Sequence, residues 1–347
     1  MRFPVVRLLL VADTHLGFDL PFRPRVARRR RGRDFFANFG RALEPALRQE
    51  VDLVVHGGDL LFRSRVPEAL VEMAMAPLVK VAQTGVPVLI VPGNHERSRI
   101  PLHLWTLHSN IHIFDEPKTF LLRIGGVDIA LSGFPFRRRA RDSFGQLVVD
   151  TGYRQVSAAI HLLCIHQTVE GAQVGVQNYT FRRGPDVVRG REIPGQFAAV
   201  LCGHIHRSQI LTHDLGGQAL AAPVVYPGAV ERTSFAERSE EKHFVIASFA
   251  PAEDGRGELV RATFVPLPSR PMESVSVEPS GLSSQALITQ LRTQLRAMDG
   301  DAVVRIQVRG PVSTEASRIL SAPSIRSLAP ASMNVTVSYH STARLVD

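Results

Sequence analysis

Cysteine is scarce in this sequence, and long apolar runs are absent. The 347 residues contain two cysteines, Cys164 and Cys202, and no C-x-x-C pair. This scarcity excludes a disulfide-stabilised scaffold and a thiolate zinc site, and it favours a reducing compartment. The longest early apolar run, Leu8–Ala12, ends at Asp13 and is too short for a signal peptide or a membrane span. We therefore predict a cytoplasmic protein without a membrane partner.

Lysine is nearly missing as well, although the chain is strongly basic. It occurs only at Lys80, Lys118 and Lys242, so 41 − 3 = 38 of the positive charges are arginines, and the formal net charge is +9. Arginine is permanently charged and presents a planar fork that matches phosphate oxygens, which favours a polyanionic partner. A GC-rich genome that prefers arginine codons would produce the same composition. Composition alone therefore leaves both explanations open.

Apolar runs alternate with amphipathic stretches through the first hundred residues. Strands are predicted at Val5–Ala12, Val51–Val55 and Pro87–Val91, with helical spacing between them at 35–47 and 67–81. This is a βαβαβ series. Polar residues follow each strand at its carboxyl end, which is where open α/β sheets place their functional sites.

Short strands dominate from about residue 110 onward. A hairpin is predicted around Gly125-Gly126, and further strands at Ile160–Ile165, Ala198–Cys202, Gln218–Tyr226 and His243–Phe249 would build a second sheet. The proline-rich segment 266–271 predicts a stiff connector. Beyond it, a helix near 287–298 and strands at 304–308 and 335–339 predict a small α+β domain. We therefore expect two domains, residues 1–268 and 269–347.

Thirteen histidines are the unusual feature of the composition, and several of them follow predicted strands. Five strand ends carry metal-ligand residue types: Asp13-x-His15, Gly58-Asp59, Gly93-Asn94-His95, His166 and Gly203-His204-x-His206. Side chains alternate with period 2 in extended chain, so Asp-x-His and His-x-His each place two ligands on one face. This mixed nitrogen and oxygen set suits Mn²⁺, Fe²⁺ or Zn²⁺. It exceeds what one tetrahedral ion uses, which favours a two-metal centre for displacement at phosphorus.

Each of these motifs has a simpler explanation when it is taken alone. Asp13 or Asp59 could be a turn or cap residue, Asn94 in Pro-Gly-Asn could be a turn residue, and His166 could be a structural histidine. Joint occurrence at the same topological position of successive strands favours the metal centre over five separate coincidences.

Together these motifs resemble the calcineurin-like binuclear metallophosphoesterases, over nearly all of residues 7–230. Within that superfamily, the opening Asp13-Thr14-His15-Leu16-Gly17 and the segment His166–Ala172 are most similar to the SbcD-type DNA repair exonucleases. The resemblance implies an α/β fold, specifically a four-layer αββα sandwich of two sheets flanked by helices. The tail is similar to the capping domain of those nucleases, which implies a small C-terminal α+β capping domain.

The resemblance also implies roles for individual residues. Asp13, His15 and His206 would hold one divalent ion, Asn94, His166 and His204 would hold the other, and Asp59 would bridge them. Mn²⁺ is the expected metal, with Fe²⁺ and Zn²⁺ as alternatives. His95 would be the catalytic residue that faces the scissile phosphate. Nuclease relatives often carry an Asp or His at the position of Phe62, so this chain departs from the pattern there.

An arginine-rich loop follows the first metal motif. We interpret these arginines as contacts to the DNA backbone, with a solvated charge run as the alternative: Arg28, Arg29, Arg30, Arg31 and Arg33. The runs 137–141 and 182–183 are weaker candidates of the same kind.

The sequence therefore predicts a two-metal DNA nuclease, exo- or endonucleolytic, acting in DNA repair or end processing. A small-molecule phosphodiesterase or phosphatase with the same site is the alternative enzyme. A DNA-binding scaffold subunit without activity is a third hypothesis. It predicts that at least one metal ligand is missing, and none is missing from this sequence. The expected partners are DNA, a second copy of the chain in a homodimer, and an SbcC-like SMC-type ATPase.

Overall fold

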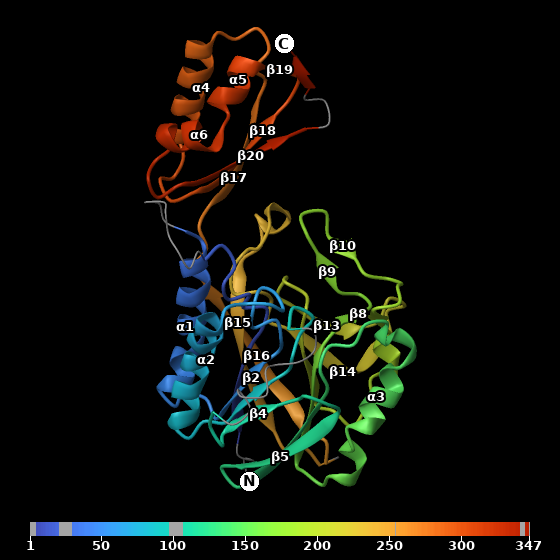
Figure 1. Cartoon of the computed structure of the whole chain (residues 1–347). Helices are drawn as coiled ribbons and strands as arrows, with labels where there is room; N and C mark the ends of the chain where they lie inside the picture. The colour runs from blue at the N-terminus through green and yellow to red at the C-terminus, as the bar shows by residue number, and fades with distance from the viewer. Residues whose placement is uncertain (1–4, 21–29, 97–106, 254, 341–343, 347) are drawn as a thin grey trace. The chain divides into compact units, whose positions relative to one another are not determined.

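The computed structural model describes residues 5–20, 30–96, 107–253, 255–340 and 344–346 (Figure 1). Two compact units divide the chain: residues 1–18 with 32–268 form the first, and residues 19–31 with 269–347 form the second.

Two six-stranded sheets make up the first unit. The order across the first sheet is β16 (Glu258–Leu267), β15 (Lys242–Ala250), β1 (Val6–Val11), β2 (Leu53–His56), β3 (Val88–Ile90) and β4 (Ile111–Ile113). Strands β1 to β4 are parallel, β15 pairs antiparallel with β1, and β16 pairs antiparallel with β15. The prediction that His243–Phe249 belongs to the second sheet is therefore wrong, because this segment lies in β15 and pairs with β1 of the first sheet.

The second sheet is also mixed. Its order is β13 (Gln209–His213), β14 (Ala219–Tyr226), β12 (Ala199–Gly203), β7 (Ile160–His166), β6 (Val127–Gly133) and β5 (Lys118–Ile124). The predicted hairpin around Gly125-Gly126 is the antiparallel pair β5–β6. Strands β6, β7, β12 and β14 are parallel, so their carboxyl ends reach one edge of the sheet.

The two sheets face each other across a shared apolar core. Alternate residues of β1 and β7, such as Leu8, Leu10, Leu162 and Cys164, are buried in this core. On the outer face of the first sheet, α1 (Gly32–Leu47) packs on β1, and α2 (Glu68–Gln83) packs on β3 and β4. On the outer face of the second sheet, α3 (Phe144–Asp150) shares a core with β7 and β12. The predicted four-layer α/β sandwich is confirmed.

The connector expected at residues 266–271 is partly wrong. Pro266 and Leu267 are the last residues of β16 and pair with β15. A proline is tolerated there because β16 is the outermost strand of its sheet, so the missing N–H breaks no ladder hydrogen bond on the outer side.

The second unit is a small α+β fold. Its three-stranded sheet is parallel throughout: β17 (Met272–Val277), β18 (Val303–Val308) and β20 (Asn334–Tyr339). Helices α4 (Ser284–Arg296), α5 (Thr314–Ile319) and α6 (Ala322–Leu328) supply the apolar side chains that cover it. Ser283 and Ser313 cap α4 and α5 by accepting a backbone N–H three residues on. Within the described parts of the chain, no helix combines the length and apolar character needed to cross a membrane.

Candidate metal centre

The carboxyl ends of five strands supply every predicted ligand of the metal centre. Asp13 and His15 follow β1, Asp59 follows β2, Asn94 and His95 follow β3, His166 ends β7, and His204 and His206 follow β12. The strands of each sheet that carry these residues are parallel, so their ends converge on one edge of the sandwich. The structure therefore gathers all eight side chains into one cluster.

The Asp59 carboxylate lies at the centre of this cluster. Its Oδ2 atom is 3.5 Å from His166 Nε2, 3.7 Å from His95 Nε2 and 4.0 Å from His15 Nε2. Its Oδ1 accepts the backbone N–H of His95 at 2.9 Å. Two ligands that each lie about 2.1 Å from one ion are about 3 to 3.4 Å apart. The separations around Oδ2 are close to that spacing, and they exceed ordinary hydrogen-bond lengths.

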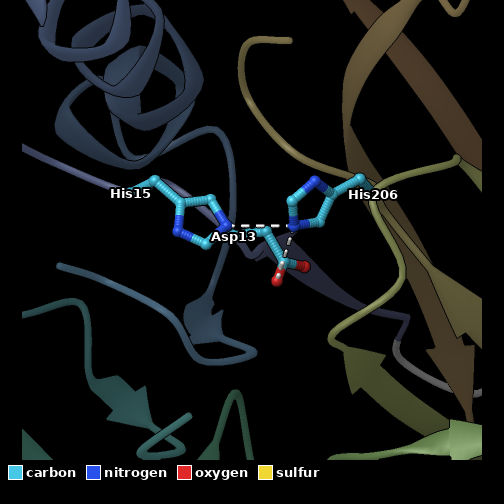
Figure 2. A group of neighbouring side chains, drawn as sticks. All are labelled: Asp13, His15 and His206. Atoms are coloured by element: carbon cyan, nitrogen blue, oxygen red, sulfur yellow. Dashed lines mark hydrogen bonds and ion pairs between the residues drawn. The ribbon is translucent and has the colours of Figure 1, made fainter. Parts of the chain in front are cut away.

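One group of donors joins the first and last motifs of the sequence. His15 Nε2 lies 3.0 Å from His206 Nε2, and His206 Nε2 lies 3.9 Å from Asp13 Oδ1 (Figure 2). One donor atom from each of these three residues falls within 4.8 Å of the others. Figure 2 shows the two imidazole rings approaching from opposite sides, with the Asp13 carboxylate beneath the gap.

A second group surrounds Asn94. Its Oδ1 atom is 2.8 Å from His204 Nδ1 and 3.1 Å from His166 Nε2. His166 Nδ1 donates to the Gly57 carbonyl at 2.7 Å, which assigns the proton of a neutral ring to Nδ1 and leaves a lone pair on Nε2. That lone pair faces the oxygens of Asn94 and Asp59, all of them acceptors. Such a site requires either a proton on Nε2 or a cation between the three atoms, so the donor set fits a metal ion.

The charges in this cluster shift the pKa values in opposite directions. Burial lowers the pKa of His166, but the carboxylates of Asp59 and Asp13 outweigh it and raise the pKa to about 9. Burial would raise the pKa of Asp59, but the neighbouring imidazoles hold it well below its usual range. Burial and the neighbouring His166 lower the pKa of His204 to about 3. The two rings therefore differ in their affinity for a proton, which His166 binds more tightly and His204 less tightly than a free histidine does.

His95 is more exposed to solvent than His15, His166 and His206 are. Its side chain is 38% exposed, whereas that of His166 is fully buried. His95 Nδ1 donates to the Phe62 carbonyl at 2.6 Å, so Nε2 is the nitrogen that faces Asp59 and solvent. The Phe62 backbone therefore orients His95, and this contact does not depend on the side chain that departs from the family pattern.

Strained backbone holds several ligands in place. Asp13, His15, Asp59 and His204 all have positive φ values between 42° and 88°, a conformation that non-glycine residues rarely adopt. Residues are held in such conformations when the surrounding structure compensates, and they cluster at functional sites. Gly58 and Gly203 pack against the rings and loops of the centre. A Cβ atom at Gly58 would lie 2.2 Å from His166 Nδ1, and one at Gly203 would lie 2.2 Å from the Gly57 carbonyl oxygen.

A buried carboxylate that the sequence analysis missed holds His206. Glu237 Oε1 accepts from His206 Nδ1 at 3.2 Å and from the Thr233 hydroxyl at 2.6 Å. Its other oxygen accepts from Lys242 Nζ at 2.6 Å, and Lys242 is fully buried. Burial would raise the pKa of Glu237, but the hydrogen bond from His206 and the charge of Lys242 hold it well below its usual range. No local pattern distinguishes Glu237, which lies 31 positions after His206 in a single 3₁₀ turn, η5 (Phe235–Glu237).

Glu96 is a second residue to which the sequence analysis assigned no role. It accepts the backbone N–H groups of Leu61 and Gly93, at 2.7 and 2.9 Å, and so ties the loop after β2 to the loop after β3. Burial and the nearby Asp59 raise the pKa of Glu96 to about 8. Its place in Gly-Asn-His-Glu was the available signal.

The predicted DNA-contact arginines fall into three groups. Arg28 and Arg29 lie outside the described residues. Arg30 forms an ion pair with Asp19, and the Arg31 backbone N–H donates to the same carboxylate at 3.1 Å. Arg33 is exposed in the first turn of α1.

Comparison with known proteins agrees with the geometry of the centre. The family model described as calcineurin-like phosphoesterase matches residues 6–208. The chain is 29% identical over 315 residues to the DNA double-strand break repair protein Mre11 of Haloferax volcanii, which covers 89% of this chain and 63% of that protein. It is 24% identical over 217 residues to the Mre11 protein of Saccharolobus solfataricus, covering 61% of this chain and 52% of that one.

A bacterial relative and two solved structures complete the comparison. The uncharacterised metallophosphoesterase YhaO of Bacillus subtilis is 25% identical over 250 residues, 68% of this chain and 55% of that protein. The chain thus spans between 52% and 63% of the length of these three relatives. A putative 5'-nucleotidase from Staphylococcus aureus aligns with a TM-score of 0.44 and 13% identity, over 85% of this chain and 58% of that one. A dimetal phosphatase from Danio rerio aligns with a TM-score of 0.44 and 14% identity, over 76% of this chain and 100% of that one.

Proposed function

This chain belongs to the calcineurin-like phosphoesterase family and is a metal-dependent hydrolase, and on that premise we propose that it is a DNA nuclease acting in DNA repair or end processing. The observation that carries the proposal is the cluster of imidazoles around Asp59 Oδ2, which suits a two-metal phosphodiesterase centre. The relatives named for DNA double-strand break repair, one of them aligned over 89% of this chain, support DNA as the substrate.

We assign the ligands by the contacts within the cluster. Asp13, His15 and His206 would hold one ion, Asn94, His166 and His204 would hold the second, and Asp59 would bridge the two. Two of the three donor groups with suitable spacing support this division, namely Asp13 with His15 and His206, and Asp59 with His166 and His204. The third group contains His95 with His15 and Asp59. We assign His95 to the substrate instead, because within this group only its side chain is open to solvent, at 38% exposed against 3% for His15 and 2% for Asp59.

The chain's own residues would orient the chemistry as follows. When bound, two divalent ions supply a hydroxide nucleophile at neutral pH and neutralise the charge that develops at phosphorus. Carbonyl groups of Gly57 and Phe62 hold the Nδ1 protons of His166 and His95, so both rings present Nε2 toward Asp59. His95 Nε2 would donate a proton to a phosphate oxygen or to the departing oxygen. We propose Mn²⁺ as the metal, since mixed carboxylate, amide and imidazole ligands suit it.

The proposal extends to partners. A homodimer and an SbcC-like SMC-type ATPase are proposed from the resemblance to SbcD-type nucleases. Purified chain would run at twice its 38.2 kDa mass if the homodimer forms, which light scattering measures directly.

The decisive experiment compares three substrates with Mn²⁺ present: linear duplex DNA, a bis-aryl phosphodiester and an aryl phosphomonoester. We expect DNA and diester cleavage by the wild type, and a loss of about 10²- to 10⁴-fold in His95→Ala. His213→Ala is the matched control, because His213 is an exposed histidine on β13 outside the cluster.

Three outcomes separate the hypotheses. Equal DNA cleavage by wild type and His95→Ala would refute the catalytic role of His95. Cleavage of the monoester alone would favour a phosphatase, and binding of DNA with no hydrolysis would favour a scaffold subunit.

A further inference from the structure

Two exposed arginine loops are joined side by side next to the metal centre. Arg137, Arg138 and Arg139 follow β6, and Arg182 and Arg183 follow the short strand β10 (Tyr179–Thr180). All five side chains are exposed. We call these two segments the joined arginine loops.

Hydrogen bonds between the two loops fix their relative positions. The Arg139 N–H donates to Asp186 Oδ1 at 2.5 Å, and the Arg141 N–H donates to the Pro185 carbonyl at 3.0 Å. The Arg141 guanidinium also donates to the Val187 carbonyl at 3.1 Å. Segments more than 40 positions apart in sequence are therefore held together, and the side chains of Arg137, Arg138, Arg139, Arg182 and Arg183 make none of these hydrogen bonds.

The first of these loops starts next to Phe136, whose ring packs against two of the proposed metal ligands. The Phe136 ring lies 5.6 Å from the His204 ring and 6.1 Å from the His166 ring, measured between centroids. The next residue, Arg137, uses its carbonyl to accept from the Gln167 side chain at 3.2 Å, and Gln167 directly follows His166. The 137–139 loop is therefore anchored beside His166 by the Gln167 hydrogen bond and packs against the His166 and His204 rings through Phe136.

Among the residues that the structure describes, no carboxylate neutralises the charge on this surface. Within the described residues, none of the five guanidinium groups forms an ion pair with a carboxylate, whereas Arg48, Arg123 and Arg189 elsewhere each have one. Asp186, the acid that lies between the loops, accepts a backbone N–H of the first loop. Five unpaired positive charges in two adjoining loops repel one another, so an anionic partner would stabilise the arrangement.

We propose that the joined arginine loops bind the phosphate backbone of the DNA strand that enters the metal centre. This rests on the proposed nuclease function and extends it, because it assigns the contact surface to residues other than the Arg28–Arg33 loop. Planar guanidinium groups match phosphate oxygens, and each neutralised phosphate releases counterions, so binding through these loops depends steeply on salt.

The test measures DNA affinity against salt for matched double variants. Binding of labelled duplex DNA is followed by fluorescence anisotropy in EDTA, where cleavage cannot occur, between about 50 and 200 mM salt. Each lost phosphate contact makes the negative slope of log K against log salt shallower by about 0.9. The rise from about 50 to 200 mM is fourfold, and Arg138→Ala/Arg182→Ala removes two contacts. This rise should therefore weaken DNA binding by the double variant about tenfold less than it weakens binding by the wild type.

The control removes the same charge from the opposite edge of the sheets. Arg48→Ala/Arg123→Ala takes away two arginines, one just after the end of α1 and one in the β5–β6 hairpin, where β6 begins. We expect the wild-type salt slope for this control, and wild-type hydrolysis of the bis-aryl diester with Mn²⁺ for both double variants.

The outcomes distinguish this proposal from the proposed function. A wild-type slope in Arg138→Ala/Arg182→Ala, with the wild type still cleaving DNA, would overturn the assignment of the loops alone. An equal drop in slope in the control would overturn it too, because net charge would then explain the effect. A wild type that hydrolyses the diester but neither binds nor cleaves DNA would overturn the nuclease function and this proposal with it.

Discussion

Replacing Glu237 by glutamine tests whether the buried carboxylate sets the proton position on His206. Both Glu237 oxygens accept hydrogen bonds: Oε1 accepts one from His206 Nδ1, and Oε2 accepts one from Lys242 Nζ. In Glu237→Gln one of these oxygens becomes an NH₂ group. Lys242 is a donor and keeps the oxygen, so the NH₂ group faces His206 Nδ1. The ring proton would then have to move to Nε2, the atom that faces His15 and Asp13.

The size of the effect follows from this single contact. Removing the hydrogen-bond partner of a metal-ligating histidine typically costs 10- to 100-fold in metal affinity. At 1.4 kcal/mol for each factor of ten, this is about 1.4 to 2.8 kcal/mol. The loss should be confined to the ion held by Asp13, His15 and His206, because Glu237 contacts none of Asn94, His166 and His204 in any hydrogen bond or ion pair within the described residues.

Calorimetric titration of the EDTA-treated protein with Mn²⁺ measures both affinities without substrate. We expect one weakened site and one unchanged site in Glu237→Gln. Glu192→Gln is the matched control, since Glu192 forms a surface ion pair with Arg189. The double variant Glu237→Gln/Lys242→Met removes the donor that holds the glutamine oxygen, so the amide can turn its oxygen to His206 and the affinity should recover. Two wild-type affinities in a folded Glu237→Gln protein would refute the positioning role.

Further predictions concern packing, pH and thiol chemistry. A Cβ at Gly203 would lie 2.2 Å from a carbonyl oxygen, so Gly203→Ala should lose Mn²⁺ binding and lower the melting temperature. Gly145 has open space around it, so Gly145→Ala should melt at or above the wild-type temperature. Equal melting temperatures for the two variants would contradict the steric argument. Burial lowers the pKa of His161, so its imidazole takes up a proton at a lower pH in the folded chain than in the unfolded chain, which does so below about pH 6.5. The stability present above that pH is therefore lost as the pH falls. In urea titrations His161→Phe should show a shallower loss between about pH 7 and 5, and an unchanged slope would count against this cause. Cys164 and Cys202 are fully buried, and burial raises the pKa of both thiols, to about 12 for Cys202. Neither thiol should therefore react with a thiol reagent until the protein unfolds, which mass spectrometry of the alkylated protein can measure.

Much of the metal centre was predictable from the sequence because its determinants are local. A strand is recognised from a short apolar run, and the residue types that follow it are read directly. Asp13-x-His15 and His204-x-His206 each follow such a run, in β1 and β12, and all the predicted ligands meet in the structure. Parallel strands bring their carboxyl ends together without any further information, which is why strand order along the chain was enough to indicate a single centre.

Other features follow from contacts between segments that are distant in sequence. β16 was missed because an outermost strand tolerates Pro266, which a local pattern treats as a strand breaker. The sequence also separates the arginine runs at 137–141 and 182–183, and long-range hydrogen bonds such as that from the Arg139 N–H to the Asp186 carboxylate bring them together.

The resemblance to a known family implied the four-layer sandwich, and the sequence by itself determined the βαβαβ series, the residue types of the centre and the strand ends that carry them. It did so because hydrophobic period and turn chemistry act over a few residues. The tertiary structure alone decided which nitrogen of His206 carries a proton, since Glu237, which is bound by the fully buried Lys242, reaches that ring only after two sheets have packed. Proton positions and charge pairing depend on distances of about 3 Å between atoms that the chain brings together last, and no local pattern records them.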